Sequence, residues 1–335
     1  MPEGIGVALI GTGMWGKRLA SAVRRTPDLR LVTCCSRDEA RRAGFARAFD
    51  CEAAETLEAA IEHPGVQGAL LVTPNYHHKE GALACAERGV PVFIEKPISD
   101  RLEDALVIRD ACNSAGIVLM IGHCFRRLGA ARKTRQILDE GLLGEPLLAE
   151  ANFSLPGTLT PDKWRYYREN CPGGPLMQLG IHHADTLQYW LGPVASVQGA
   201  FAHRLTPAEI DDIGVANLVF ESGALGTLTS SYVSPKTFSL RLYGDRAVLD
   251  YRTDMSVWPN AEQMDSATTL TLTMRSGSEP VPFETQDMLV EELSEFARCI
   301  RGESSPETGA QEGLRALAVV LGALESHQSG RRVQL

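Results

Sequence analysis

The first 123 residues alternate short apolar runs with segments whose apolar positions recur at helical spacing. The strand-like runs are GVALIG, LVTCCS, GALLVTP, PVFIEKP and IVLMIG, separated by helical stretches such as MWGKRLASAVRRT and SDRLEDALVIRDACNSAG. Parallel strands need crossover connections, and crossover helices cover both faces of the sheet. The pattern therefore predicts an α/β domain with a doubly wound parallel sheet over residues 1–123.

A different pattern covers residues 124–335. Helices are predicted over Gly129–Gly141, from Pro175 to Leu191, and over the two tail segments Met288–Cys299 and Thr308–His327. Between them lie the strand-like segments LLAEANFSL, VASVQGAFAHRL, VANLVFESGALGTLTSSYVS, FSLRLYGDRAVLDY and TTLTLTM, with turn residues separating them. We expect a second α/β domain with a large, mostly antiparallel open sheet, and its C-terminal helices could pack back on the first domain.

Composition narrows the function classes. The 33 Lys and Arg against 42 Asp and Glu give a net charge of −9, without the basic block typical of nucleic-acid binding. The N-terminus lacks the features of a signal peptide, and no apolar run approaches the roughly 18 residues that span a bilayer. The eight cysteines contain no C-x-x-C pair. We therefore expect a cytoplasmic protein with small-molecule ligands and no nucleic-acid, membrane or metal partner.

Gly11, Gly13 and Gly16 form a G-x-G-x-x-G motif between the first strand-like run and the first helical stretch. In this position the first glycine permits a tight turn, the second lets backbone N–H groups approach a pyrophosphate, and the third lets the helix pack on the strand. The motif predicts dinucleotide binding. Ser36 and Arg37 follow the second strand, where NAD enzymes place an acid. They suit a 2′-phosphate, so we lean towards NADP, although a solvated Arg37, an Asp38 helix cap and NAD remain open.

Two further features carry candidate chemistry. Lys96, in Glu95-Lys96-Pro97, ends a strand at the edge where ligands of parallel sheets bind. It could exchange a proton with a substrate, or equally pair with Glu95 at the surface. Gln178, His182 and Asp185 are spaced to share one face of an otherwise apolar helix. That face could contact a ligand, or form a buried network in which Asp185 orients His182.

Taken together, the glycine loop, Thr73-Pro74-Asn75 with His78, Glu95-Lys96-Pro97 and GGPLMQLGIHHAD resemble the glucose-fructose oxidoreductase / inositol dehydrogenase / rhizopine catabolism (Gfo/Idh/MocA) family. The resemblance spans essentially the whole chain. It implies an N-terminal Rossmann domain, a C-terminal domain for substrate binding whose open sheet mediates homodimers or homotetramers, and nicotinamide-dependent oxidation or reduction of sugars and polyols.

The resemblance also implies roles for individual residues. Lys96 and His182 would be catalytic and would share proton transfer. The cofactor would be NAD(P), leaning NADP, held by Gly11, Gly13, Met14, Trp15, Gly16, Ser36, Arg37, Thr73, Pro74, Asn75, His78 and Glu95. The carbohydrate-like substrate would contact Lys96, Arg126, Trp164, Arg165, Gln178, His182 and Asp185. For Trp164 and Arg165 a packing aromatic with a solvated neighbour is an equal alternative.

One departure from the family pattern lends weight to a function without chemistry. Gln178 stands where many polyol dehydrogenases of the family carry an aspartate, and a glutamine cannot take up a proton. The alternatives are a small-carbonyl or dihydrodiol-type reductase, an NAD-dependent redox glycosidase, and a cofactor-binding sensor without chemistry. The presence of both Lys96 and His182 favours an enzyme.

Overall fold

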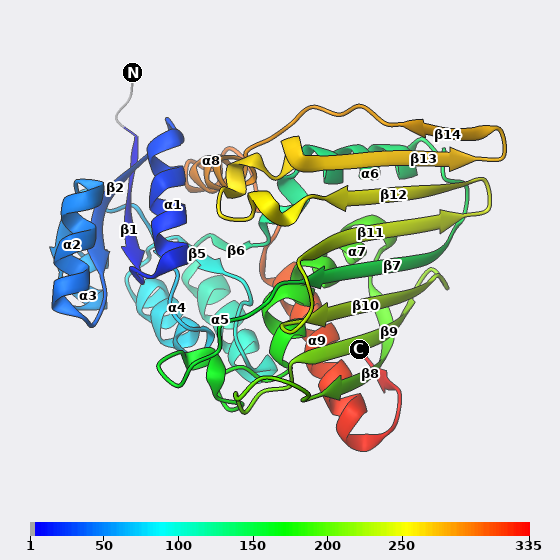
Figure 1. Cartoon of the computed structure of the whole chain (residues 1–335). Coiled ribbons are helices and arrows are strands. Elements are labelled where there is room, and N and C mark those ends of the chain that lie inside the picture. Colours follow the sequence, from blue (N-terminus) through cyan, green and yellow to red (C-terminus); the bar gives the residue numbers. More distant parts are fainter. Residues whose placement is uncertain (1–3) are drawn as a thin grey trace. The chain divides into compact units, whose positions relative to one another are not determined.

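The computed structural model describes residues 4–335, which divide into two compact units. The first holds the chain up to His123 together with Leu289–Leu314, and the second holds Cys124–Met288 and Arg315–Leu335. In Figure 1 the first unit therefore contains the blue and cyan segments and part of the orange-red tail. Each unit is described by itself.

The first unit is built on a six-stranded parallel sheet of order β3-β2-β1-β4-β5-β6. Its strands are β1 (Ile5–Ile10), β2 (Leu29–Cys35), β3 (Glu52–Ala54), β4 (Gly68–Leu71), β5 (Val92–Glu95) and β6 (Leu119–Gly122). Every residue of β1, β4, β5 and β6 is buried, as expected where helices cover both faces. The predicted doubly wound parallel sheet is confirmed, and its strand order is that of a dinucleotide-binding Rossmann fold.

Helices contributed by distant parts of the chain cover this sheet. They are α1 (Met14–Arg25), α2 (Glu39–Phe49), α3 (Leu57–Ile61), α4 (His78–Glu87), α5 (Leu102–Ala115) and α8 (Met288–Ile300). The ring of Phe296 on α8 lies 5.9 Å from that of Phe93 on β5, edge to face. Thr308 donates its hydroxyl to the carbonyl of Ile121 at 2.7 Å. Residues 187 positions apart thus complete one core.

The second unit is built on a nine-stranded sheet of order β14-β13-β12-β11-β7-β10-β9-β8-β15. Its strands are β7 (Pro146–Ser154), β8 (Val194–Ala202), β9 (Ile213–Phe220), β10 (Leu225–Ser231), β11 (Thr237–Gly244), β12 (Ala247–Thr253), β13 (Thr268–Met274), β14 (Gly277–Pro280) and β15 (Val333–Gln334). The β7–β10 pair is parallel and the other pairs are antiparallel. The prediction of a large, mostly antiparallel sheet is confirmed.

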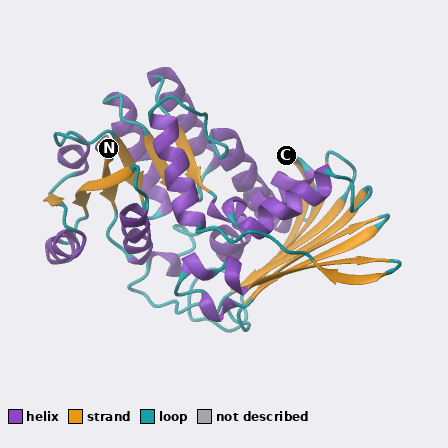
Figure 2. Ribbon diagram, turned by 90° about the horizontal axis from the view of Figure 1, so that it is seen from above, coloured by secondary structure: helices purple, strands orange, loops and turns teal. Residues whose placement is uncertain are grey.

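Helices α6 (Gly129–Asp139), α7 (Ile181–Leu191) and α9 (Ala310–Ser329) belong largely to this unit. In Figure 2 the helices next to the large sheet lie along one of its faces. A Cβ atom on Gly199 of β8 would lie only 2.0 Å from the carbonyl oxygen of Ala323, so the α9 backbone approaches the strand closely. Along β11 the alternation is regular: Leu240 is buried, whereas Ser239 and Arg241 are half-exposed. The second face of the sheet is therefore polar and partly accessible.

Four short elements were not anticipated from the sequence: β3, β14, β15 and α3. They have two to five residues each, too few to show an apolar periodicity. Strand β14 is exposed throughout, so its sequence does not show the alternation of apolar and polar residues that a buried face produces. No helix in the described part of the chain has the length and apolar character needed to cross a membrane.

Candidate functional site

The glycine loop between β1 and α1 contains glycines required for two different reasons. Gly11 has φ +111°, and a Cβ atom there would lie 2.5 Å from the carbonyl oxygen of Val72. A Cβ atom on Gly16 would lie 2.1 Å from the Gly11 carbonyl oxygen. Both are needed for the loop to fold. Gly13 is exposed, and nothing lies within 4 Å of its Cβ position, so its lack of a side chain leaves open space instead.

That open space lies at the start of α1, which begins at Met14. The first turn of α1 contains no acidic residue, and Gly13 supplies no side-chain cap. The unpaired N–H groups and positive dipole end of a helix favour an anion at this position. The loop therefore fits the pyrophosphate of a dinucleotide, which would occupy the space that a Cβ atom on Gly13 would fill.

The end of β2 lies beside this loop. Gly11 donates its N–H to the carbonyl of Cys35 at 2.9 Å, and Thr12 donates its hydroxyl to Ser36 at 2.8 Å. Arg37 is exposed and has no ionic or hydrogen-bonded partner in the part of the chain that the structure describes. Asp38 caps α2 by accepting the N–H of Arg41 at 2.8 Å. A hydroxyl and a guanidinium thus follow β2, the strand after which Rossmann domains in general place the residue that recognises the adenosine ribose.

Strands β4 and β5 are neighbours, so the loops that follow them leave the same edge of the sheet. His78 is completely buried between these loops, with Nδ1 at 2.9 Å from the Pro97 carbonyl and Nε2 at 3.0 Å from the Thr73 carbonyl. Burial lowers the pKa of His78 to about 4. At neutral pH one ring N–H donates to one of the two carbonyls, so His78 holds the Thr73-Pro74-Asn75 loop near Lys96-Pro97.

The glycine loop is also tied to the strand that carries the lysine. Trp15 donates its indole N–H to Glu95, which is buried at the end of β5. The guanidinium carbon of Arg18 lies 4.9 Å from the centre of the Trp15 ring. Lys96 is half-buried and directly follows Glu95. The sequence indicated each residue separately, but a contact across 80 positions has no local signal.

In the second unit, the expectation of one regular helix carrying Gln178, His182 and Asp185 is wrong at its start. Leu176–Gly180 forms a π-helical turn, and α7 begins only at Ile181. The extra residue in the turn changes the angle between Gln178 and His182 from that of an α-helix. All three polar side chains are at least nine-tenths buried, as their apolar surroundings predicted.

Asp185 is bound by Arg126 rather than by a histidine. The guanidinium donates two hydrogen bonds of 2.7 Å to the Asp185 carboxylate, and both residues are buried. His182 stacks on Phe125, with ring centres 4.1 Å apart. Nε2 of the neighbouring His183 lies 3.3 Å from the Asn152 carbonyl oxygen, which can only accept a hydrogen bond. Burial lowers the pKa of His183 to about 3, so the ring is neutral at pH 7.

Of the two candidate substrate clamps, Arg165 contacts both Gln178 and the other clamp, Trp164. The Arg165 Nε–H donates to the Gln178 amide oxygen at 3.0 Å, and the guanidinium carbon lies 4.4 Å from the centre of the Trp164 ring. The second unit thus joins Trp164, Arg165 and Gln178 in one cluster and Arg126 with Asp185 in another. The partners of Gln178 and Asp185 could not be identified from spacing, because both arginines belong to other segments.

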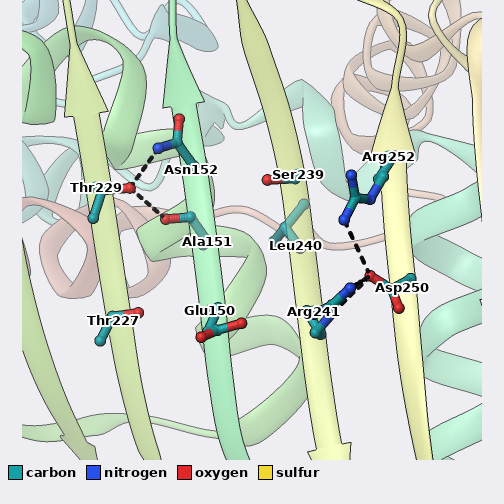
Figure 3. A pocket seen from close by; sticks show the side chains of 10 residues that line it. All are labelled: Glu150, Ala151, Asn152, Thr227, Thr229, Ser239, Leu240, Arg241, Asp250 and Arg252. Atoms are coloured by element: carbon teal, nitrogen blue, oxygen red, sulfur yellow. Dashed lines mark hydrogen bonds and ion pairs between the residues drawn. The ribbon is translucent and has the colours of Figure 1, made fainter.

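A hollow of about 260 Å³ lies on the polar face of the nine-stranded sheet and contains none of the predicted site residues (Figure 3). Asp250 forms ion pairs with Arg241 at 2.6 Å and Arg252 at 3.8 Å along it. Asn152 donates to Thr229 at 2.7 Å on the other side. Its ionic and hydroxyl groups largely satisfy one another.

Comparisons with known proteins agree with both units. Residues 5–123 match the model of an oxidoreductase family with an NAD-binding Rossmann fold, and residues 131–250 match a GFO/IDH/MocA C-terminal domain. A solved structure from Desulfitobacterium hafniense, described as that of a candidate NADPH-dependent oxidoreductase, is 36% identical with a TM-score of 0.95, covering 100% of this chain and 98% of that one.

Two characterised relatives also match along nearly their whole length. The chain is 25% identical to 1,5-anhydro-D-fructose reductase of Ensifer adhaerens, covering 98% of this chain and 97% of the relative. It is 25% identical to the NAD(+)-dependent scyllo-inositol 2-dehydrogenase of Bacillus subtilis, covering 100% of this chain and 97% of the relative. The chain therefore belongs to the Gfo/Idh/MocA family of oxidoreductases.

Proposed function

We propose that this protein is an NAD(P)-dependent oxidoreductase that acts on a hydroxyl or carbonyl of a sugar, polyol or sugar derivative. The observation that carries the proposal is the open space at Gly13, at the start of α1, because it gives the loop after β1 room for an anion. Strand β4 lies next to β1, and β5, which precedes Lys96, lies next to β4. The sugar and polyol substrates named for the two characterised relatives support this substrate class.

In this reaction the residues of the chain would have different roles. The bound nicotinamide supplies the acceptor or donor for hydride. Lys96 and His182 would share the proton of the reacting hydroxyl, which requires both side chains to reach the same substrate. Gln178 would orient a second substrate hydroxyl by hydrogen bonding, since an amide cannot take up the proton itself.

NADP is the preferred form in this proposal. Ser36 and Arg37 can hydrogen-bond a 2′-phosphate, and Asp38, which could otherwise accept from a ribose hydroxyl, caps α2. The NADPH dependence described for the Desulfitobacterium hafniense protein agrees with this preference.

The test is reduction of NADP or NAD in the presence of a panel of aldoses, inositols and sugar acids, followed at the absorbance of the reduced nicotinamide. Lys96→Ala should lower turnover by about 10²- to 10⁴-fold while cofactor affinity changes little, because general acid–base groups contribute about that much. A loss smaller than tenfold would remove Lys96 from proton transfer.

A cofactor-binding sensor is the second candidate, favoured by the neutral Gln178. It predicts tight NADPH binding with no turnover on any member of the panel in either direction. Measurable turnover on a sugar or polyol excludes it.

We also propose that the polar face of the nine-stranded sheet joins two copies of the chain. Half-exposed Ser239, Arg241 and Tyr243 alternate there with buried residues, so this face presents an accessible polar surface on which a second copy could pack. Arg252, whose side chain is 66% exposed, is a suitable probe. Arg252→Glu should shift the protein towards monomers in sedimentation velocity, and an unchanged distribution would place the interface elsewhere.

A further inference from the structure

The segment from Pro156 to Pro175 presents Arg165 from a fixed position on the second unit. Gly157 donates its N–H to the Tyr232 carbonyl at 2.9 Å, and Tyr166 donates its hydroxyl to the Pro207 carbonyl at 2.7 Å. These bonds flank Arg165 on both sides in the sequence. The arginine therefore starts from an ordered backbone rather than from a free loop.

The Arg165 side chain is itself oriented by two contacts. One face of its guanidinium lies over Trp164, and its Nε–H donates to Gln178. A guanidinium has five N–H donors, so these contacts leave the four on the two terminal nitrogens. Arg165 is exposed, and those donors have no hydrogen-bonded or ionic partner among the residues that the structure describes.

The other cations of this segment are neutralised. Lys163 pairs with Asp162 at 2.6 Å, and Arg168 pairs with Asp211 at 3.3 Å. Arg165 has no acidic partner within the described ranges. A fixed guanidinium with both terminal nitrogens available matches the two oxygens of a carboxylate. A phosphate dianion would need a second cation beside Arg165, and the other cations of this segment, Lys163 and Arg168, already pair with aspartates.

Gln178 links this cation to the proposed reaction site. Because a guanidinium only donates hydrogen bonds, the atom of the Gln178 amide that faces Arg165 must be its oxygen, which leaves the amide nitrogen to donate elsewhere. Gln178 is buried and precedes His182 by four positions on the same helical run. An anion on Arg165 would therefore lie next to groups proposed to bind substrate hydroxyls.

We infer that Arg165 anchors a carboxylate of the substrate, so that the substrate is a sugar acid such as an aldonate or uronate rather than a neutral sugar. The inference rests on the proposed function and narrows its substrate class. A single charge-assisted contact of this kind corresponds to about tenfold or more in kcat/KM.

The experiment compares kcat/KM for D-glucose, D-gluconate, D-glucuronate and D-glucose 6-phosphate, and for the corresponding galactose series. The wild-type protein should prefer one class of acid to its neutral parent by at least about tenfold. Arg165→Met should reduce that ratio to near one, and Arg165→Lys should restore part of it. Lys163→Met is the control, because it removes a charge two positions away whose partner is Asp162, and it should retain the ratio.

Several outcomes overturn the inference. Equal or better use of neutral sugars by the wild-type protein does so, as does an acid preference that survives in Arg165→Met. A preference for the phosphate over both acids assigns Arg165 a different anion. If no compound is turned over, the proposed function fails instead, and calorimetric titration of the NADPH-loaded protein with the acids and their neutral parents still tests the anchor. Equal affinity of acids and neutral sugars in that titration would refute it.

Discussion

The substitution Gly13→Val separates cofactor binding from folding, because this glycine is not needed for the loop itself. Its φ of −71° and ψ of −169° suit any residue, and a Cβ atom would contact nothing within 4 Å. Valine is a poorer helix cap than glycine, which costs about 0.5–1 kcal/mol, and a stiffer unfolded chain offsets about 0.4–1 kcal/mol. We expect the free energy of unfolding to change by less than about 1 kcal/mol.

Cofactor binding should respond very differently. The valine side chain would fill the space assigned to the pyrophosphate, removing backbone hydrogen bonds to a charged group that are worth about 1.5–3 kcal/mol each. Loss of two such bonds corresponds to at least about 100-fold weaker binding of NADPH and NADH alike. Calorimetric titration and urea unfolding measure the two effects on the same samples. Wild-type affinity in Gly13→Val would refute this placement of the pyrophosphate.

A matched variant distinguishes local blocking from general damage. Gly16→Val places a Cβ atom 2.1 Å from the Gly11 carbonyl oxygen, so it should destabilise the loop as well as weaken cofactor binding. If Gly13→Val were destabilised as much as Gly16→Val, the open space described at Gly13 would not exist in solution.

The other predictions concern single contacts of the first and second units. Arg37→Ala should weaken NADPH binding by about tenfold or more and leave NADH within about twofold, and equal losses would count against 2′-phosphate recognition. Trp15→Phe removes a donor to the buried Glu95 and should lower the free energy of unfolding by about 1–3 kcal/mol in urea titrations, whereas no change would mean that this bond does not hold the loop. Burial lowers the folded-state pKa of His183 to about 3, so as the pH falls the unfolded chain protonates His183 at a higher pH than the folded chain does. Stability is therefore full above about pH 6.5 and falls towards pH 3, by up to about 1.4 kcal/mol per pH unit. His183→Gln should flatten that slope, and an unchanged slope would show that the folded protein protonates His183.

Much of the fold was predictable because burial leaves a periodic record in the sequence. Strands covered on both faces, such as β1 and β5, appear as unbroken apolar runs, and the strands of the second unit show alternation. Short or exposed elements such as β14 leave no such record. The π-helical turn at Leu176–Gly180 also left none, since all five of its residues are buried and show no alternation of buried and exposed positions.

The candidate site was predictable only where its residues are adjacent in sequence. The glycine loop is one continuous motif, so its chemistry follows from local spacing. Polar side chains within an apolar helix correctly indicated that Asp185 needs a partner, but not that Arg126, 59 positions away, would supply it. The same limit applies to Trp15 with Glu95, where only the folded sheet brings the two segments together.

The charge of residue 178 connects these observations with the choice of substrate. An aspartate at this position, as in many polyol dehydrogenases that the chain resembles, would meet the Arg165 guanidinium and neutralise it. Glutamine keeps the hydrogen bond at 3.0 Å but leaves the positive charge uncompensated, whereas the buried Arg126 is neutralised by Asp185. In the proposed function, the neutral side chain of Gln178 therefore has two consequences: it cannot take up the proton of the reacting hydroxyl, and it leaves the charge of Arg165 available for an anion.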